Sequence, residues 1–256
     1  MTPLRIHRLP ALRDNYLWLL HAPDTGETAV VDPAEAGPVE AALAREGWRL
    51  THILNTHHHA DHTGANRVLK ERWGCAVIGP RADRDRIPAI DQAVGEGDEI
   101  HLGRHIARVF DVPGHTRGHI AYWFSDDEAV FVGDTIFAAG CGRMFEGTQE
   151  QFWDSLKRLR DLPDPTRVFC AHEYTESNLR YAADVLPEDR AIRQRQAEVL
   201  AMRAQGEATV PSLLGVEKRT NPFLRCDQPE LAAAVGLSGA PPATVFGALR
   251  ARKDAF

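Results

Sequence analysis

The sequence predicts a layered α/β domain that is followed by a helical C-terminal domain. Two observations support this fold class. Strand-like apolar runs alternate with helix-like segments along the first part of the chain, whereas the pattern after residue 174 is helical and shows no further convincing strand. We therefore expect one domain over residues 1–174 and a second, helical domain over residues 175–256.

The chain opens with an expected hairpin. Apolar runs at 16–20 and 28–31 predict two strands, and Pro, Asp, Thr and Gly at 23–26 predict the turn between them. The next expected elements are a helix from Pro38 to Gly47, a strand at 52–54, a helix from Thr63 to Gly74 and a strand at 76–79. Alternation of this kind is typical of an α/β layer.

The second half contains more strands and then long helices. Strands are expected at 106–110, 120–124, 129–132 and 167–171, beyond a polar, turn-rich segment at 80–100. Thr148 followed by Gln151 predicts a capping box, and Phe152, Leu156 and Leu159 give the helix that follows one apolar face. Apolar stripes predict two further helices, over 188–205 and 242–254.

Composition excludes several classes of function. The chain of 256 residues is 43% hydrophobic and 26% charged with a net charge of −6, and its acidic and basic residues are interspersed. We therefore expect neither a nucleic-acid partner nor a membrane partner. The absence of a long apolar run and of a signal-peptide pattern at the N-terminus predicts a cytoplasmic protein. The four cysteines form no C-x-x-C pair, so neither a disulfide framework nor a cysteine zinc site is expected.

A turn rich in histidine and aspartate runs from Asn55 to His62, after the predicted strand at 52–54. Further candidate ligands lie at or just after the ends of later predicted strands, so all of them can converge on one edge of a sheet sandwich. The candidate metal ligands are His57, His59, Asp61, His62, His115, Asp134 and His172. A single catalytic zinc uses about three protein ligands. The larger set therefore indicates two divalent ions, which share a bridging Asp.

The spacing of these residues predicts how they point. His57 and His59 are two residues apart, so on extended backbone they face the same side and can bind one ion, whereas His58 should point away. Asp61 and His62 lie past the turn and can reach a second ion. His119 is expected to support a ligand or the fold, and Asp32 to orient a ligand histidine. His7, His21, His52, His101 and His105 have no such neighbours, and we expect ordinary surface or core positions for them.

The string T-H-H-H-A-D-H at 56–62 resembles the hallmark motif of the metallo-β-lactamase superfamily. The segments 114–119, 133–135 and 171–174 resemble its later motifs, in the expected order. The resemblance implies an αβ/βα sandwich with a dinuclear site at its edge. It also implies that His57, His59 and His115 bind one metal and that Asp61, His62 and His172 bind the other. Asp134 would bridge the two, which makes Asp61 and Asp134 the expected catalytic carboxylates.

Other stretches narrow the resemblance to one family. Those at 12–16, 138–147, 172–175, 220–225 and 249–254 are similar to glyoxalase II, the hydroxyacylglutathione hydrolases, and span nearly the whole chain. By this resemblance Arg143, Tyr174, Arg250 and Lys253 would bind glutathione, whose two carboxylates suit cationic donors. Arg250 and Lys253 share a face of the predicted helix, and Arg252 does not. Arg143 replaces a common Lys, and Phe145 replaces a common Tyr and so removes a hydroxyl.

The activity that the resemblance implies is hydrolysis of a glutathione thioester, typically S-D-lactoylglutathione, by a hydroxide activated by two divalent metal ions. Zinc is the expected metal, with iron or manganese as alternatives. The expected partner is the small-molecule substrate alone, and the expected state is a monomer. Cys141 is expected to pack rather than to act as a nucleophile. The alternatives are a persulfide dioxygenase with one iron, a β-lactamase, and a metal-binding module without activity.

Overall fold

The structure is a computed structural model that describes residues 2–256; Met1, the first residue of the predicted α/β domain, lies outside the described residues. The chain divides into two compact units. Unit 1 comprises Met1–Asp111 and Arg117–Gly133, and unit 2 comprises Val112–Thr116 and Asp134–Phe256. The expected domain boundary at residue 174 stays a prediction. It rests on the change in sequence pattern, whereas the two units are defined by the contacts within each of them.

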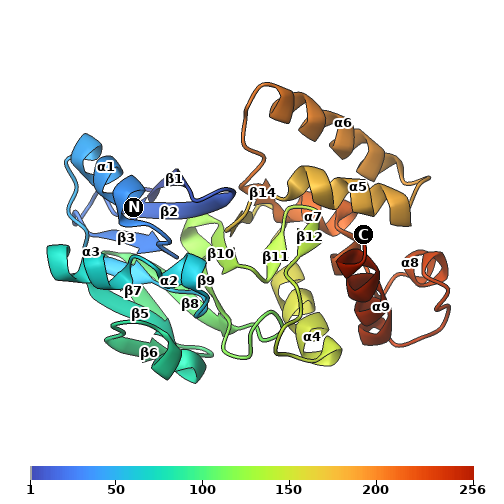
Figure 1. Ribbon diagram of the computed structural model, residues 1–256, viewed down its shortest axis with the longest axis horizontal. Coiled ribbons are helices and arrows are strands. Elements are labelled where there is room, and N and C mark those ends of the chain that lie inside the picture. The colour runs from blue at the N-terminus through green and yellow to red at the C-terminus, as the bar shows by residue number, and fades with distance from the viewer. Residues whose placement is uncertain (1) are drawn as a thin grey trace. The chain divides into compact units, whose positions relative to one another are not determined.

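Unit 1 contains two sets of strands and the helices that cover them (Figure 1). Six strands form one sheet in sequence order, antiparallel from β1 to β3 and parallel from β3 to β6. Strands β7 to β10 pair in order and antiparallel. The elements are β1 (Arg5–Ala11), β2 (Asn15–His21), β3 (Thr28–Val31), α1 (Ala36–Glu46), β4 (His52–Leu54), α2 (Ala60–Thr63), α3 (Asn66–Trp73), β5 (Ala76–Pro80), η1 (Arg81–Arg86), β6 (Gln92–Val94), β7 (Glu99–Leu102), β8 (His105–Asp111), β9 (Ile120–Phe124), η2 (Ser125–Asp127) and β10 (Ala129–Gly133).

The core of unit 1 lies between the six-stranded sheet and helices α1 and α3. Val39 and Leu43 of α1 and Leu69 of α3 are fully buried against apolar residues of β1 to β5. Gly47 and Gly74 end these two helices in the left-handed conformation, with φ of 69° and 65°. Each helix therefore ends where the chain turns back toward the sheet. The histidine-rich segment lies in the turn that follows β4.

Unit 2 is mostly helical (Figure 1). Two short antiparallel strand pairs, β11 with β12 and β13 with β14, accompany the helices. The elements are β11 (Ile136–Phe137), β12 (Gly140–Cys141), α4 (Gln149–Arg160), β13 (Arg167–Cys170), α5 (Thr175–Val185), α6 (Arg190–Ala204), β14 (Ser212–Leu213), α7 (Leu214–Thr220), η3 (Pro222–Leu224), α8 (Pro229–Ala234) and α9 (Pro242–Asp254). Helix α4 packs on α9 through Phe152 and Phe246, whose ring centroids are 5.1 Å apart.

Most predicted elements are confirmed, and two predictions are wrong. The helix expected to start at Thr63 is preceded by the four-residue helix α2, which carries Asp61 and His62, and α3 begins only at Asn66. A short strand, β14, occurs after residue 174, where none was expected. It has only two residues, too few to give a strand pattern. No helix within residues 2–256 combines the length and the apolar character that crossing a membrane requires.

Candidate metal centre and substrate-binding residues

Unit 1 gathers the ligand candidates of the histidine-rich turn. His57 Nε2 lies 3.1 Å from His59 Nδ1, with the ring planes at 79°, so the two side chains lie on the same side as their spacing predicts. His62, on α2, is fully buried, and its ring centroid is 4.0 Å from that of His57. The Asp61 carboxylate lies 3.5 Å from His62 Nε2. The turn and the first turn of α2 therefore place four candidate ligands in two adjacent pairs.

Asp32 binds two residues of the histidine-rich turn, Thr56 and His62. Its carboxylate accepts hydrogen bonds from the backbone N–H and the hydroxyl of Thr56, both at 2.7 Å, and it lies 3.1 Å from His62 Nδ1. Asp32 is 3% exposed, with φ of 50°. Because a carboxylate only accepts, the proton of a neutral His62 must be on Nδ1, which leaves the Nε2 lone pair for a metal. This geometry agrees with the orienting role expected of Asp32.

The neighbouring histidines His58 and His119 take other roles. His58 points away from His57 toward Asp83, at 3.0 Å between Nδ1 and the carboxylate. His119 stacks on His57 with ring centroids 4.6 Å apart, and its Nδ1 lies 3.0 Å from the carbonyl of Ile120. A ring held in this way can limit the motion of His57.

Unit 2 gathers the other three ligand candidates. The Asp134 carboxylate lies between two imidazoles, with one oxygen 3.5 Å from His115 Nε2 and the other 3.4 Å from His172 Nε2. His115 Nδ1 lies 2.8 Å from the carbonyl of Arg143, which can only accept. The other ring nitrogen of His115 therefore faces Asp134 with its lone pair, unless the ring is protonated.

These two clusters fit divalent metal ions. In a tetrahedral zinc site, the usual bond lengths separate a ligand nitrogen from a ligand oxygen by about 3.4 Å. The observed separations at Asp134 are 3.4 and 3.5 Å. At both His62 and His115, an oxygen acceptor holds Nδ1 while Nε2 faces a carboxylate. Two electron-rich atoms face each other favourably only with a cation between them or a proton on the ring, and this arrangement is usual for metal-binding histidine.

Three of the four candidate substrate-binding residues are accessible. Arg143 is exposed, with its Nε 3.7 Å from Asp254. Tyr174 stacks in parallel on His172, with ring centroids 4.8 Å apart. Lys253 is half-buried over the rings of Tyr181 and Phe256, and its Nζ donates to the carbonyl of Ser177 at 3.3 Å. Burial, followed by the nearby Arg250 and Arg180 charges, lowers the pKa of Lys253 to about 8.

Arg250 differs from the other three, because it is only 5% exposed. Its guanidinium donates to the carbonyl of Cys141 at 2.9 Å and to Asp254 at 3.0 Å. Arg252 leaves the helix in another direction and pairs with Asp184 at 2.6 Å. Arg250 and Arg252 thus point in different directions, as the helical spacing predicts, but this spacing does not show that Arg250 is buried against backbone.

Comparison with known proteins decides the family. The family model described as the metallo-beta-lactamase superfamily matches residues 13–172, and the model described as the hydroxyacylglutathione hydrolase C-terminus matches residues 173–256. A hydroxyacylglutathione hydrolase of Methylococcus capsulatus (strain Bath) is 56% identical over 253 residues, which cover 99% of each chain. The chain belongs to the hydroxyacylglutathione hydrolase family.

A second relative agrees with the family assignment, and a solved structure shares the fold. A protein of the same name from Rhodospirillum rubrum is 52% identical over 256 residues, which cover 100% of each chain. The solved structure of the BLEG-1 B3 metallo-beta-lactamase has a TM-score of 0.67 at 20% identity and covers 86% of this chain and 99% of its own. The expected fold class, an α/β metallo-β-lactamase fold with a C-terminal helical region, is confirmed, as is the expected resemblance.

The surroundings of Cys141 fit a packing role in this hydroxyacylglutathione hydrolase family member. Burial raises the pKa of the Cys141 thiol to about 11. The thiol is therefore protonated at neutral pH and is a poor nucleophile. Burial likewise raises the pKa of Cys75 to about 11 and that of Cys170 to about 12.

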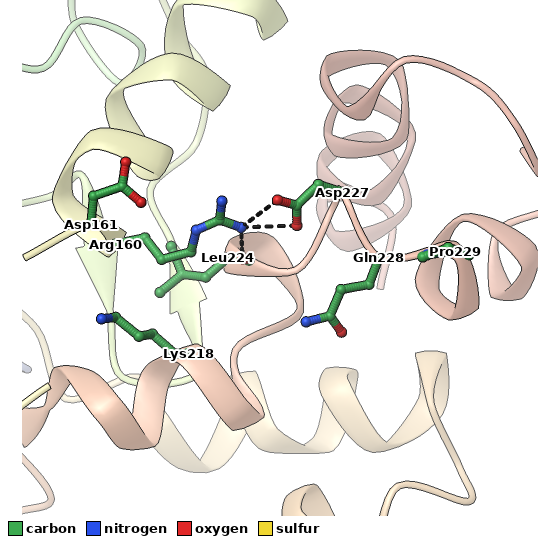
Figure 2. Close-up of a pocket in the computed structure, with 7 residues that line it drawn as sticks. All are labelled: Arg160, Asp161, Lys218, Leu224, Asp227, Gln228 and Pro229. Atoms are coloured by element: carbon green, nitrogen blue, oxygen red, sulfur yellow. Dashed lines mark hydrogen bonds and ion pairs between the residues drawn. The ribbon is translucent and has the colours of Figure 1, made fainter.

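A surface pocket of about 690 Å³ lies elsewhere in unit 2 (Figure 2). Arg160 donates to the carbonyl of Leu224 and to Asp227, both at 2.9 Å. Lys218 also lines the pocket and donates to Asp164 at 2.6 Å. The predicted site residues, all within the described part of the chain, are absent from its lining. The two cations Arg160 and Lys218 are thus each paired with a carboxylate, and the pocket does not contain the candidate site.

Several supporting residues escaped the sequence analysis. Asn178, Glu217 and Asn221 hold the backbone of residues 137–140 by hydrogen bonds. Asn221 lies in the stretch at 220–225 that carries the family resemblance, and this is the only signal that pointed to it. Asn178 and Glu217 lie on helices that the sequence pattern did not resolve individually, so no signal distinguished them from surface polar residues.

Proposed function

We propose that this family member hydrolyses the thioester of S-(2-hydroxyacyl)glutathione, typically S-D-lactoylglutathione, to glutathione and D-lactate. This is the second step of methylglyoxal detoxification. The observation that carries the proposal is 56% identity over 99% of the chain to a protein named hydroxyacylglutathione hydrolase. In the reaction, water adds to the thioester carbon, the C–S bond breaks and the thiolate takes up a proton. The leaving group needs no strong acid, because the pKa of a thiol is only about 8.5.

We propose that seven residues bind two divalent ions. His57, His59 and His115 would hold one ion, Asp61, His62 and His172 the other, and Asp134 would bridge them. When bound, such ions lower the pKa of a coordinated water and polarise the carbonyl of the substrate. Zinc is the proposed metal, because histidine and carboxylate ligands suit it; iron and manganese are the alternatives that metal analysis distinguishes.

A side-chain acceptor and a backbone acceptor of the protein would keep two of these ligands oriented for metal binding. Asp32 fixes the ring of His62, and the carbonyl of Arg143 fixes the ring of His115, each through Nδ1. Asp134 offers one carboxylate oxygen to each of two histidine neighbours, which is the arrangement that a bridging ligand requires. Asp61 is partly exposed and pairs with His62, so its carboxylate would be accessible to a bound substrate.

We propose that the glutathione moiety binds to cations and a ring in unit 2. Arg143 and Lys253 would pair with its carboxylates by charge-assisted hydrogen bonds, and Tyr174, held flat on His172, would contact its backbone. Arg250 would add positive charge to the same region. Phe145 is 60% exposed and contacts the ring of His115 edge-on at 5.3 Å, so it offers an apolar wall without a hydroxyl. A monomeric state and a cytoplasmic location stay predictions.

The alternatives fit this chain less well. The two relatives at 56% and 52% identity are both named hydroxyacylglutathione hydrolase. A persulfide dioxygenase with one iron would not need Asp61, His62 and His172 as ligands. A β-lactamase would leave the cationic residues of α9 without a task, and a module without activity would have no need for two ligand clusters.

One experiment separates these possibilities. The purified protein is assayed with S-D-lactoylglutathione, a β-lactam and glutathione persulfide with oxygen uptake, and its metal content is measured on the same preparation. We expect thioester hydrolysis with two metal ions per chain. Asp134→Ala should lower both kcat and metal content, whereas the exposed control Asp126→Ala should change neither. Full activity and full metal content in Asp134→Ala would contradict the bridging role of Asp134.

A further inference from the structure

Asn15, the first residue of β2, is in direct contact with the candidate ligand Asp61. Asn15 is only 5% exposed. Its Nδ2 donates to the Asp61 carboxylate at 3.2 Å and to the backbone carbonyl of the same residue at 3.3 Å. An ionised carboxylate and a carbonyl can only accept, so the nitrogen of the amide is the end that faces Asp61. One buried amide therefore binds both the side chain and the main chain of Asp61.

The carboxylate of Asp61 depends on such a bond more than its neighbour on α2 does. The Asp61 side chain is 39% exposed, whereas that of His62 is 1% exposed. A buried imidazole is fixed by the atoms packed around it, but a partly exposed carboxylate can rotate into water, and ordering it costs conformational entropy. Hydrogen bonds from the protein to a ligating carboxylate supply this restraint in metal sites.

The bond to the main chain of Asp61 fixes the short helix that carries it. Helix α2 has only four residues, so its carbonyls lie beyond the reach of a continuing helix and need other donors. Asn15 donates to the carbonyl of Asp61, and Asn55 Nδ2 donates to the carbonyl of His62 at 2.9 Å. Each of the two ligand candidates on α2 is thus bound through its backbone by an asparagine, and Asn15 in addition binds the carboxylate.

The turn between β1 and β2 determines where Asn15 lies. Asn15 pairs with Ala11 across the hairpin. Between these two residues, Leu12 has φ of 49°, in the left-handed region that a leucine side chain rarely adopts. The N–H of Leu12 donates to the carboxylate of Glu35, the N-cap residue of α1, at 2.8 Å. The hairpin is therefore bonded to the start of α1, and this contact holds the turn that precedes Asn15.

We propose that Asn15 is a positioning residue for Asp61 and thereby retains one of the two metal ions, the ion that Asp61, His62 and His172 would bind. This role of Asn15 rests on the proposed metal ligands and involves no contact with the substrate. The other ion would be held by His57, His59 and His115, so Asp61 is not among its ligands. Loss of the Asn15 amide should therefore weaken the binding of one ion and spare the other.

The test compares Asn15→Leu and Asn15→Ala with the wild type. Leucine keeps the branched shape of asparagine but has no donor for Asp61. Each protein is loaded with two metal ions, the release of each ion to a chelator is followed with time, and the visible spectrum of the cobalt-loaded protein is recorded. For both variants we expect one ion to be released about tenfold faster than in the wild type, the other at the wild-type rate, and a changed cobalt spectrum.

Two controls separate the positioning of Asp61 from a general loss of stability. Arg13→Ala removes an exposed side chain from the same turn and should release both ions as the wild type does. Val39→Ala leaves a cavity in the core between α1 and the sheet, so it should lower the Tm of the metal-free protein without selective release of one ion. A purely structural Asn15 would give variants that behave like Val39→Ala.

A further variant keeps the test decisive if neither Asn15 variant folds. Glu35→Ala leaves Asn15 in place and removes an exposed acceptor from the turn, so the same ion should be released faster. The proposal is overturned if the Asn15 variants release both ions at the wild-type rate or both equally fast. Where they do not fold, wild-type release in Glu35→Ala overturns it. A wild type that binds fewer than two ions or lacks thioesterase activity would instead contradict the proposed function itself.

Discussion

Lys253 is a half-buried cation whose charge should depend on pH close to neutrality. Its pKa is lowered to about 8 by burial, and Arg250 and Arg180 add to the shift. The ammonium is therefore present below pH 8 and is lost as the pH rises through that value. If Lys253 binds a carboxylate of glutathione, the KM for the thioester should rise as the pH is raised from 7 to 9.

Steady-state kinetics over this pH range test the assignment of Lys253. In Lys253→Gln we expect a KM that is already high, by about tenfold, and that no longer rises through pH 8, because a charged hydrogen bond contributes about 1.5–3 kcal/mol. Arg252→Gln serves as the matched control on the same helix. An identical rise of KM with pH in the wild type and in Lys253→Gln would assign the titration to another group.

Asp32 gives a prediction about metal affinity at the residue scale. Asn at this position keeps the size of the side chain but offers one acceptor oxygen in place of two, so the Thr56 and His62 contacts cannot all be kept. Asp32→Asn should weaken metal binding by about tenfold or more. Chelator competition measures the effect, with Asp126→Asn as the control. Wild-type affinity in Asp32→Asn would show that His62 does not depend on this partner.

For single residues, the sequence predicted the direction of a side chain better than the atoms that the side chain packs against. The pairing of His57 with His59 and the outward direction of His58 follow from the two-residue repeat of extended backbone. The burial of Arg250 could not be predicted, because helical spacing tells which residues share a face but not what that face packs against. The ligand assignments themselves stay predictions until metal binding is measured.

Helix α4 illustrates an element whose start the sequence determined. Thr148 accepts a hydrogen bond from the N–H of Gln151 at 3.3 Å, and the Gln151 side chain accepts one from the N–H of Thr148 at 3.1 Å, which completes the predicted capping box. Loss of such a cap costs about 1 kcal/mol. Thr148→Ala should lower the free energy of unfolding by this amount, and Thr148→Ser should not.

Urea denaturation of the two variants and the wild type, all loaded with metal, measures the effect of the cap. We expect unchanged metal content in both variants, because the cap lies at the surface of α4. Equal unfolding free energies in all three proteins would show that the cap contributes nothing to the stability of unit 2.

Elements with short or irregular patterns were harder to predict. Strand β1 carries charged residues and Pro10 on a partly exposed edge, β6 has three residues, and β11 and β12 have two each. None of these segments offers enough alternation to stand out from a loop. Helix α5 follows Tyr174 directly, and its start lacks a side-chain cap. Such elements are specified by contacts with distant segments, which a single sequence does not display.

At the scale of the whole molecule, metal binding should stabilise the fold. The proposed ligands come from unit 1 and from unit 2, so ions that bind only the folded chain favour the folded state by mass action. At a free metal concentration of about 100 times Kd the gain is about 2.7 kcal/mol per site. Chelator treatment should therefore abolish activity and lower Tm, and added zinc should restore both.

Calorimetry at several zinc concentrations checks this dependence. The increase in Tm should follow the zinc concentration in the wild type and should be much smaller in Asp134→Ala, with Asp126→Ala behaving as the wild type. A Tm that is independent of metal, together with full activity after chelation, would contradict a metal-dependent enzyme.

Four side chains of unit 2 hydrogen-bond to the backbone of residues 138–141, and these contacts also limit how the protein can be redesigned. The four residues are Asn178, Glu217, Asn221 and Arg250. A helical tail taken from another member of the superfamily would lack these anchors, even if its substrate pocket were ideal. Exchange of the tail alone should then remove the hydrogen bonds that hold residues 138–141, as well as change the substrate specificity. A chimaera with a new substrate specificity would therefore need this segment and the four residues that bind it from the same parent protein.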